Sequence, residues 1–578
     1  MKLISTILIC SVLTIAFAGC NNGANKTSSE KSAVTFDAVY FGGDIITMEG
    51  DSASYVEAVG VKDCKIVFAG SKADAEKMQG DSTIMNDLAG KTMFPGFFDS
   101  HSHLADAINI AGQANVSSPP VANCKTINDV IAALQKCKEE NNIKDGEWIF
   151  GWGYDEAQLN EKRPPNKMDL DKAFPKNPVF IRHVSGHLGV ANSLALADAQ
   201  IDKNTKNPAG GTILRLPGST EPSGVLEEMA LHHFLEVASK VFASQQSKLL
   251  QKTLESYASY GITTVQEGFS DSNAIAFLKT SAAANNLFLD VVSLTSFIDL
   301  AKNIKDSSLN YGKYNNHLKF AGTKIVADGS PQGKTAFFTK PFLTPVPGKS
   351  KDYRGFSNVT QDQMNKMFDA CYKSNQQLIV HCNGDGTMDM LLKAHEYACK
   401  ANNQPLDADR RTVVIHSNFV RMDQLQKYKE YKITPSFFTN HTFFWGDVHI
   451  KNLGQERAFF ESPIHSADSI GIIYSNHTDF IVTPLDQIFT IWSAVNRTSR
   501  SNVVIGPNER ATPYQALKAL TINAAYQYFE ENNKGSIKSG KLADLVILDK
   551  NPLKVDPMTI KDIKVVETIK EGKAIYKN

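Results

Sequence analysis

The 578-residue sequence predicts an α/β protein with a (β/α)₈, TIM-like barrel, a small β-sandwich domain and an inserted subdomain after the first barrel strand. Three observations predict this architecture. Eight short apolar segments recur through the middle of the chain, with helical stretches between several of them. Both chain ends alternate in the manner of strands. One connection, about residues 105–243, is too long for a βα loop.

The N-terminus resembles a lipoprotein signal peptide, which we place at residues 1–19. Lys2 gives a positive start and residues 3–18 are almost wholly apolar. The sequence Phe17-Ala-Gly-Cys20 resembles a bacterial lipobox, so Cys20 is expected to become the lipidated N-terminus. A plain secretory signal with an incidental cysteine is the alternative. Polar residues 20–33 form a flexible tether. We therefore expect a protein of the bacterial cell envelope, lipid-anchored to a membrane and facing the periplasm or exterior.

The segments that follow the tether and close the chain are each too short for a stable sheet. We therefore expect residues 34–93 and 525–578 to form one composite β-sandwich domain. Its expected strands include residues 38–41, 44–48, 65–69, 544–548, 565–569 and 573–576.

Residues 94–524 form the expected barrel domain. Its strands are predicted at 93–98, 262–266, 289–294, 318–326, 377–380, 412–415, 433–437 and 471–475. Helices are predicted at 244–259, 360–374 and 388–401. The insertion has its own helix at 127–140 and strands near 148–150 and 179–182, and we expect it over the barrel mouth.

The composition limits the classes of molecule that this protein is expected to bind. The formal net charge is zero, which gives no support for a nucleic-acid partner, so a small molecule is expected. The eight cysteines show no CxxC spacing, which argues against a zinc ribbon. Cys124 with Cys137 and Cys371 with Cys399 are candidate disulfides, and free buried thiols are the alternative. No segment after the signal is long enough to span a membrane.

Histidines at the end of the first strand suggest a metal site. Residues i and i+2 of a strand point the same way, so His101 and His103 aim two imidazoles at one point, as zinc requires. That pair alone is a weak signal. Its weight comes from further candidates at the ends of later strands, which converge on one barrel mouth. These are Lys324 on the fourth strand, His381 after the fifth, His416 after the sixth and Asp479 after the eighth.

This order of residues resembles the amidohydrolase superfamily, and further motifs resemble its YtcJ-like branch, amidohydrolase family 3, which includes N-substituted formamide deformylases. The motifs include Gly151-Trp-Gly-Tyr-Asp155, Gly186-His-Leu-Gly-Val-Ala-Asn192, Gly261-Ile-Thr-Thr-Val-Gln266, His441-Thr-Phe-Phe-Trp-Gly-Asp447 and Gly535-Ser-Ile-Lys-Ser-Gly-Lys-Leu-Ala-Asp-Leu545. The resemblance runs from about residue 36 to 577.

The resemblance implies roles for the strand-end residues. His101, His103 and Asp479 would hold one divalent metal, expected to be zinc, and His381 and His416 a second. Lys324 would carry a carbamate that bridges the two. Asp479 would also be the catalytic proton carrier. A single metal is the alternative, with Lys324 then a structural lysine paired with Asp328. Ser417-Asn418 and Cys382 depart from what relatives often have, but neither removes a ligand.

Other residues are weaker candidates for substrate contact. Glu267 follows the second strand and could support a metal ligand or touch substrate. His183 and His187 lie in the insertion, where an ordinary role is equally expected. His441, with Phe443, Phe444 and Trp445, suggests an aromatic pocket wall, although such clusters usually form core. His477 packs or binds substrate. Arg182 and Arg215 are candidate anchors for a substrate carboxylate.

The expected function is hydrolysis of a C–N bond in a small amide, N-formyl or N-acyl compound by a metal-activated water. The alternatives are a mononuclear deaminase or cyclic-amide hydrolase of the same superfamily, a catalytically retired solute-binding lipoprotein, and a structural surface lipoprotein. The sequence does not reveal the oligomeric state; homodimers are common among relatives, and the resemblance adds a homodimer to the candidate assemblies.

Overall fold

The computed structural model describes residues 35–578 apart from 120, 157, 184–187, 209–210 and 347–348. The signal peptide, the tether with Cys20 and the candidate His187 lie outside these residues. Within the described part of the chain, no helix has the length and apolar character needed to cross a bilayer.

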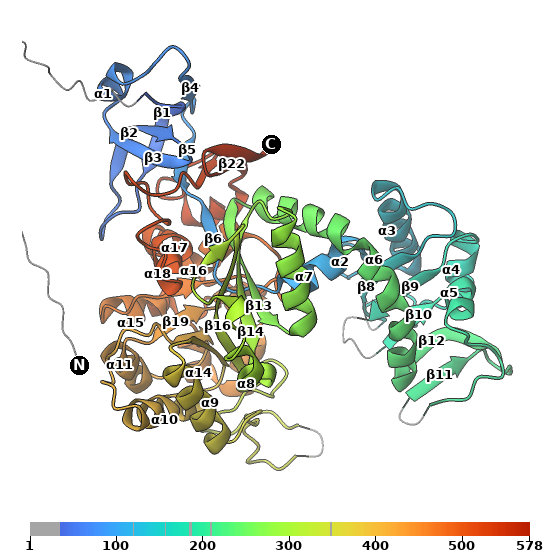
Figure 1. Cartoon of the computed structure of the whole chain (residues 1–578). Coiled ribbons are helices and arrows are strands. Elements are labelled where there is room, and N and C mark those ends of the chain that lie inside the picture. The colour runs from blue at the N-terminus through green and yellow to red at the C-terminus, as the bar shows by residue number, and fades with distance from the viewer. Residues whose placement is uncertain (1–34, 120, 157, 184–187, 209–210, 347–348) are drawn as a thin grey trace, which may run out of the picture.

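The centre of the molecule is a barrel of eight parallel strands (Figure 1). Around the barrel they run β6 (Phe97–Asp99), β13 (Ile262–Ser270), β14 (Asp290–Ser296), β16 (Leu318–Val326), β17 (Gln377–Cys382), β18 (Val413–His416), β19 (Thr434–Phe437) and β20 (Ser475–Asn476). A short strand, β15 (Tyr314–Asn315), pairs antiparallel with β16. The predicted barrel is confirmed, and β16 has the predicted bounds, but β20 has only two residues.

The short β20 explains how the barrel closes. β6 and β20 are the first and last strands of the strand order. The barrel is closed by hydrogen bonds between the loops that follow these two strands. The Asp479 amide donates to the His101 carbonyl (3.0 Å), and the His103 amide donates to the Phe480 carbonyl (2.7 Å). The buried Asp99 carboxylate also accepts the Thr478 amide (3.1 Å) and hydroxyl (2.5 Å). These bonds fix the segment that carries Asp479 against the one that carries His101 and His103.

Helices cover the outside of the barrel, and their sequences show why they form. In α9 (Gln361–Lys373) the Thr360 side chain caps the first turn, and Gln363 completes a capping box. Its buried face carries Met364, Phe368 and Cys371, spaced at helical intervals. The other helices of the barrel domain are α7 (Ser272–Ala283), α8 (Leu300–Asn303), α10 (Asp385–Ala401), α11 (Met422–Tyr431), α12 (Asn440–Phe444), α13 (Gly446–Leu453), α14 (Gln455–Phe459), α15 (Ile464–Ser469), α16 (Gln487–Asn496), α17 (Pro513–Leu520) and α18 (Ile522–Gln527).

Both chain ends contribute strands to one small domain. The predicted sandwich takes the form of one continuous sheet, ordered β23-β22-β21-β5-β1-β2-β3, with β4 paired to β1. Its strands are β1 (Ala38–Ile46), β2 (Tyr55–Lys62), β3 (Lys65–Gly70), β4 (Ile84–Asp87), β5 (Thr92–Pro95), β21 (Leu545–Leu548), β22 (Val565–Lys570) and β23 (Lys573–Lys577), with α1 (Lys72–Lys77) beside them. Ile46 and Val546 belong to the same hydrophobic cluster as the barrel helices, so this domain packs on the barrel.

Buried charges join the C-terminal strands to the barrel. Asp290, at the start of β14, lies 2.6 Å from Lys534 Nζ and 3.0 Å from Lys570 Nζ. Lys570 also contacts Asp544 (3.1 Å). Each of these side chains is at most 5% exposed, so the opposite charges compensate one another away from water.

The insertion after β6 is a separate α/β unit, as predicted. Its sheet runs β11-β12-β10-β9-β8-β7 and has its own hydrophobic cluster. The strands are β7 (Ala114–Asn115), β8 (Ile149–Tyr154), β9 (Val179–His183), β10 (Leu188–Ala191), β11 (Gly211–Arg215) and β12 (Pro222–Glu228). The helices are α2 (Leu104–Ala111), which leaves the barrel, α3 (Ile127–Glu140), α4 (Lys167–Ala173), α5 (Ser193–Asp198) and α6 (Met229–Ser259), which returns to it. Figure 1 shows this unit, in teal, beside the barrel.

The disulfide candidates were wrong. Cys124, Cys137, Cys371 and Cys399 are all free and buried. The Cys137 thiol donates instead to the Gly112 carbonyl (3.4 Å), and the Cys399 thiol lies 3.6 Å from the His395 ring. Burial raises the pKa of Cys124 to about 11 and that of Cys371 to about 12, so these thiols stay protonated. The alternative of free buried thiols is the correct one.

Candidate metal centre

A cavity of about 680 Å³ opens at the barrel mouth, and all six predicted metal ligands line it. They come from the ends of five different strands, as expected where parallel strands converge. The other lining residues are Ala105, Asp106, Ile108, Asn109, Glu267, Phe269, Asp271, Asn273, Ala274, Phe277, Val326 and Val482. Beyond α2, none of the described residues of the insertion belongs to this lining, so the expectation that it covers the mouth is not met in the described part of the chain.

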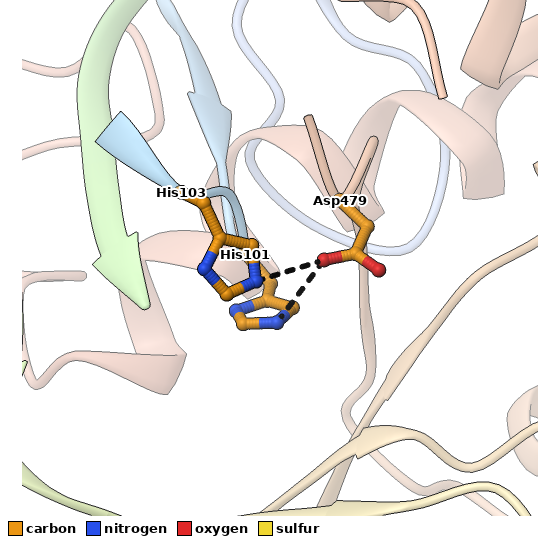
Figure 2. Close-up of side chains that lie close together, drawn as sticks. All are labelled: His101, His103 and Asp479. Atoms are coloured by element: carbon orange, nitrogen blue, oxygen red, sulfur yellow. Dashed lines mark ion pairs between the residues drawn. The ribbon is translucent and has the colours of Figure 1, made fainter. Parts of the chain in front are cut away.

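Figure 2 shows one carboxylate oxygen of Asp479 facing a ring nitrogen of each of the two histidines that follow β6. Its Oδ1 is 3.3 Å from His101 Nε2 and 3.4 Å from His103 Nε2. The three ligand atoms lie within 4.8 Å of one another. Oδ1 is buried and accepts no hydrogen bond from the described residues. A buried carboxylate oxygen without a donor, beside two imidazole nitrogens, fits a divalent cation.

Gln266 fixes the tautomer of His101. The Gln266 amide nitrogen donates to the Ser100 carbonyl (2.8 Å), so its oxygen must accept from His101 Nδ1 (2.5 Å). Nδ1 of His101 therefore carries the proton, and the lone pair of Nε2 faces Asp479. Burial, followed by the charge of Lys324, holds the pKa of His101 well below its usual value, which keeps the ring neutral and able to coordinate.

Lys324 lies at the floor of the cavity. Its Nζ is 3.0 Å from His101 Nε2, and the residue is 1% exposed. Burial lowers the pKa of this amine to about 7. The alternative that pairs Lys324 with Asp328 is wrong, because Asp328 contacts His381.

His381 is oriented by a buried carboxylate. Its Nδ1 lies 3.1 Å from Asp328 Oδ1, which also accepts the Asn383 amide (3.0 Å). The second oxygen of Asp328 accepts the Gly384 amide (2.9 Å) and the Thr387 hydroxyl (2.7 Å). With Nδ1 bound in this way, Nε2 of His381 is the nitrogen available to a metal, which is the usual carboxylate–histidine arrangement of such sites.

His416 is held by a second histidine. Its Nδ1 lies 3.1 Å from His477 Nε2, and His477 Nδ1 lies 2.9 Å from the Ser436 hydroxyl. Nε2 of His416 is then left 3.9 Å from Asp479 Oδ2. Burial lowers the pKa of His477 to about 3, so this histidine is a neutral hydrogen-bonding partner. His477 thus packs against a candidate ligand and does not line the cavity.

Backbone strain marks two of the candidate ligands. His416 has φ +70° and Asp479 has φ +51°, both in the left-handed region that residues with a Cβ seldom adopt. Such conformations cost free energy and persist where the surroundings impose them, most often at functional sites.

Asp479 and His103 influence each other's charge. Burial alone would raise the pKa of Asp479 and lower that of His103, but their mutual contact outweighs burial in both cases. The pKa of Asp479 is lowered and that of His103 is raised. Asp479 is therefore an anion at neutral pH, which suits both a metal ligand and a proton acceptor.

Glu267 lies at the cavity, next to His103. It is 2% exposed, and its two oxygens accept the amides of Ala105 (2.6 Å) and Phe269 (3.0 Å). Ala105 belongs to the first turn of α2, so Glu267 caps that helix and holds the turn after His103. Burial raises the pKa of Glu267.

Other weaker candidates lie away from the cavity. His441 packs between Phe438 and Trp445, with ring centroids 4.4 and 4.5 Å away, and neither His441 nor Trp445 lines the cavity. His441 is therefore better described as part of a packed aromatic cluster than as a wall of the cavity. His183 lies 3.1 Å from Glu156 within the insertion.

Neither arginine reaches the cavity. Arg215 donates to the backbone carbonyls of Asp202, Thr205 and Thr220, so it stabilises a turn of the insertion. Arg182 lies in the insertion sheet, on β9. Both were wrong as anchors for a carboxylate in this cavity.

Sequence reasoning missed the residues that orient the ligands. Gln266 ends the Gly261-Ile-Thr-Thr-Val-Gln266 motif and lies on β13, and Asp328 follows Lys324 by four residues, just beyond the end of β16. Both lie at or just after the ends of strands predicted from the sequence, which was the available signal. Their partners are far away in sequence, so no local pattern could assign them.

The chain is similar to known amidohydrolases along most of its length. Residues 85–576 match a family model described as "Amidohydrolase family". N-substituted formamide deformylase of Arthrobacter pascens is 25% identical over 90% of this chain and 95% of its own length. Putative amidohydrolase YtcJ of Bacillus subtilis is 27% identical over 93% of this chain and 99% of its own.

A solved structure shares the fold. An uncharacterized metal-dependent hydrolase from Pyrococcus furiosus superposes with a TM-score of 0.70 at 23% identity, covering 89% of this chain and 100% of that one. Together these matches confirm the resemblance that the dispersed motifs predicted.

Proposed function

The chain belongs to the metal-dependent amidohydrolase family, and on that premise we propose that it hydrolyses a C–N bond in a small amide, N-formyl or N-acyl compound. The observation that carries this proposal is the convergence of His101, His103 and Asp479 on one point, with a buried Asp479 oxygen that accepts no hydrogen bond from the part of the chain that the structure describes. The similarity to an N-substituted formamide deformylase supports the bond type.

The donor set suits two divalent ions. His101, His103 and Asp479 would hold the first, and His381 and His416 the second, because each ring offers the nitrogen opposite its protein hydrogen bond. Neutral imidazoles with a carboxylate favour zinc. When bound, the ions lower the pKa of a water molecule and polarise the amide carbonyl of the substrate.

Lys324 fits the role of a carbamate-bearing lysine. Burial lowers the pKa of its amine to about 7, and only the neutral amine adds to CO₂. The addition forms a bond from Nζ to the carbon of CO₂ and releases one proton. The carbamate product offers two oxygens as metal ligands, whereas the ammonium form of lysine would repel a cation.

The chain's own residues would manage the proton. Asp479 is anionic at neutral pH and lies beside the cavity, so it can accept the proton of the attacking water and give it to the leaving nitrogen. Gln266 and Asp328 hold the rings of His101 and His381 during the reaction. His103 keeps Asp479 ionised.

A substrate panel tests this proposal. Protein purified without chelators and supplied with zinc and bicarbonate is assayed on N-formyl and N-acyl amines, with release of the amine as the readout. We expect turnover that is lost in Asp479→Asn. Release of ammonia from amino-heterocycles, with no amide hydrolysis, would favour a deaminase instead.

We also propose that the chain is exported and lipid-anchored through Cys20. The basis is the sequence Phe17-Ala-Gly-Cys20 after an apolar segment. Growth of cells with a labelled fatty acid should label the wild-type chain and leave Cys20→Ala unlabelled. An unlabelled wild-type chain would refute the anchor.

A further inference from the structure

The rim of the cavity is acidic. Asp106 on α2 and Asp271 at the start of α7 line it, and both are exposed to solvent. Glu267 adds a buried carboxylate below them, and Asp106 is near enough to contribute to the raised pKa of Glu267. Asp106 and Asp271 follow the first and second barrel strands and Glu267 lies on the second, so the negative charge gathers on one side of the mouth.

No free cation balances this rim among the described lining residues. Apart from the histidines, Lys324 is their only basic side chain, and it is buried at the floor. Arg215 is occupied by backbone carbonyls elsewhere. A substrate carboxylate at the rim would therefore meet like charges without a counter-ion, which costs free energy and slows encounter.

Asp271 caps a helix with only one of its two carboxylate oxygens. Its Oδ1 accepts both the Asn273 amide (2.9 Å) and the Ala274 amide (2.8 Å), which caps α7. No described hydrogen bond engages the other carboxylate oxygen, Oδ2. The amide side chains of Asn109 and Asn273 stand beside these carboxylates in the lining and add neutral acceptors.

Apolar side chains also line the cavity: Ile108 is buried, Phe269 and Phe277 are half-buried, and Val482 is 49% exposed. By exposure, Phe269 and Phe277 stand between the buried metal ligands and the exposed Asp106 and Asp271. An exposed apolar side chain inside a cavity gains free energy when a ligand covers it. The cavity thus has a polar floor for the amide, an apolar wall for a hydrocarbon arm and an acidic rim.

We propose that the site selects amides that carry a hydrocarbon arm ending in a protonated amine, and disfavours their carboxylate analogues. This inference rests on the proposed function, because it assumes that the amide reacts at the floor. The order of the three zones sets the order of the substrate's groups. The scissile amide binds at Asp479, the arm lies along Phe269 and Phe277, and the ammonium group reaches Asp106 and Asp271.

Three substrates built on one scaffold test the inference. They are N-formylbenzylamines with hydrogen, aminomethyl or carboxylate at the para position, which share one scissile bond. We expect kcat/KM to fall from the cation to the neutral compound to the anion, with the cation ahead of the anion by about tenfold or more. The ratio should shrink as salt rises from about 0.02 M to about 0.5 M.

Binding gives a readout that does not need turnover. The matching N-methylsulfonyl benzylamines keep the shape and lack a hydrolysable carbonyl. Their dissociation constants, measured by calorimetry, should follow the same order. Asp106→Asn and Asp271→Asn should each lower the preference for the cation severalfold, and the asparagine at 271 keeps the helix cap. Glu76→Gln, which removes an exposed charge from the small β domain, should leave the preference unchanged.

The outcomes separate the two proposals. Equal kcat/KM for all three substrates, or a preference for the anion, overturns the inference and leaves amide hydrolysis standing. Absence of turnover on every amide by zinc-loaded protein overturns both. A cation preference that survives in the Asp106→Asn, Asp271→Asn double variant overturns the assignment of the rim.

Discussion

Asp328 Oδ1 lies 3.1 Å from His381 Nδ1, and among the described residues Asp328 forms no ion pair with a lysine or an arginine. It joins the loop after β16 to the loop after β17, because it also accepts the amides of Asn383 and Gly384. The ring of His381 is thus fixed by the same group that fixes the backbone around it, and its Nε2 is the ring nitrogen left for a metal.

Asp328→Asn should weaken binding of the second metal ion by about 10- to 100-fold, because a neutral amide orients and polarises the ring less well. Equilibrium dialysis with zinc measures this loss. Thr387→Val is the matched control, since it removes another donor to the same carboxylate and leaves the contact with His381. Unchanged zinc affinity in Asp328→Asn would show that the carboxylate does not support the metal site.

Gly268→Ala should disturb His101. A Cβ at residue 268 would lie 2.6 Å from His101 Cε1 and 2.9 Å from the Ser102 carbonyl oxygen, so the ring or the strand must shift. We expect lower zinc content and at least tenfold lower turnover in a folded protein, as is usual for misplacement near 1 Å. Gly80→Ala is the control, because its Cβ would meet no backbone atom at close range, and its nearest neighbours would be Thr35 Cγ2 at 3.1 Å, Thr35 Cβ at 3.3 Å and Thr83 Oγ1 at 3.9 Å. Full zinc content in Gly268→Ala would contradict the geometry at His101.

Metal loading should depend on pH through Lys324. Burial lowers the pKa of its amine from 10.5 to about 7, so the neutral form that adds CO₂ grows as pH rises through about 7. Between pH 7 and pH 10.5, Lys324 is protonated in the unfolded chain and neutral in the folded, metal-free protein. Burial of the ammonium group therefore lowers the free energy of unfolding by its full amount below pH 7, and this destabilisation decreases as pH rises toward 10.5.

Reconstitution of the metal-free protein with zinc should accordingly improve with pH and with added bicarbonate. Carbon NMR with ¹³C-bicarbonate should give a carbamate signal that Lys324→Gln lacks. Equal reconstitution with and without bicarbonate, and no carbamate signal, would leave Lys324 as a structural lysine.

Asp290→Asn should destabilise the fold at a distance from the cavity. Burial would raise the pKa of Asp290, but Lys534 and Lys570 outweigh burial and hold it below its ordinary value. The stabilisation that the ionised Asp290 gives to the folded state is therefore present above pH about 4 and is lost as pH falls into the acid range. The substitution removes one charged partner from each of two buried ammonium groups, and Lys534 keeps Glu530 while Lys570 keeps Asp544, so the free energy of unfolding falls by at most about 3–5 kcal/mol.

Thermal unfolding of Asp290→Asn measures that cost, with Asp362→Asn as the control. Asp362 is exposed and forms an ion pair with Lys366 on the helix surface, where solvent screens the pair and its contribution to stability is small. An Asp290 variant as stable as the Asp362 variant would show that the buried ions do not hold the C-terminal strands to the barrel.

Much of the barrel and of the ligand order could be predicted from the sequence, because local signals carry them. The strand β16 had its bounds predicted from one apolar run, and the strand-end position of His381 follows from the same kind of pattern. Local signals did not reveal the short β20. Its segment is held by Asp99, which is 379 residues from Thr478 in sequence.

The rest of the site depends on contacts between distant segments. Gln266 orients His101 across 165 residues, and Asp328 orients His381 across 53. Spacing suggested disulfides between cysteines that in fact have other neighbours, because proximity in sequence does not set Sγ distances. His441 looked like a pocket wall since it follows a strand at the mouth, but its helix turns it into an aromatic cluster.

The central claim is that the six strand-end residues form a hydrolytic metal centre. Elemental analysis of the purified chain, run beside amide turnover for wild type and His101→Ala, tests it most directly. We predict two divalent ions per wild-type chain, a loss of at least one ion in His101→Ala, and no turnover in the variant. Full activity in a metal-stripped His101→Ala protein would contradict the account.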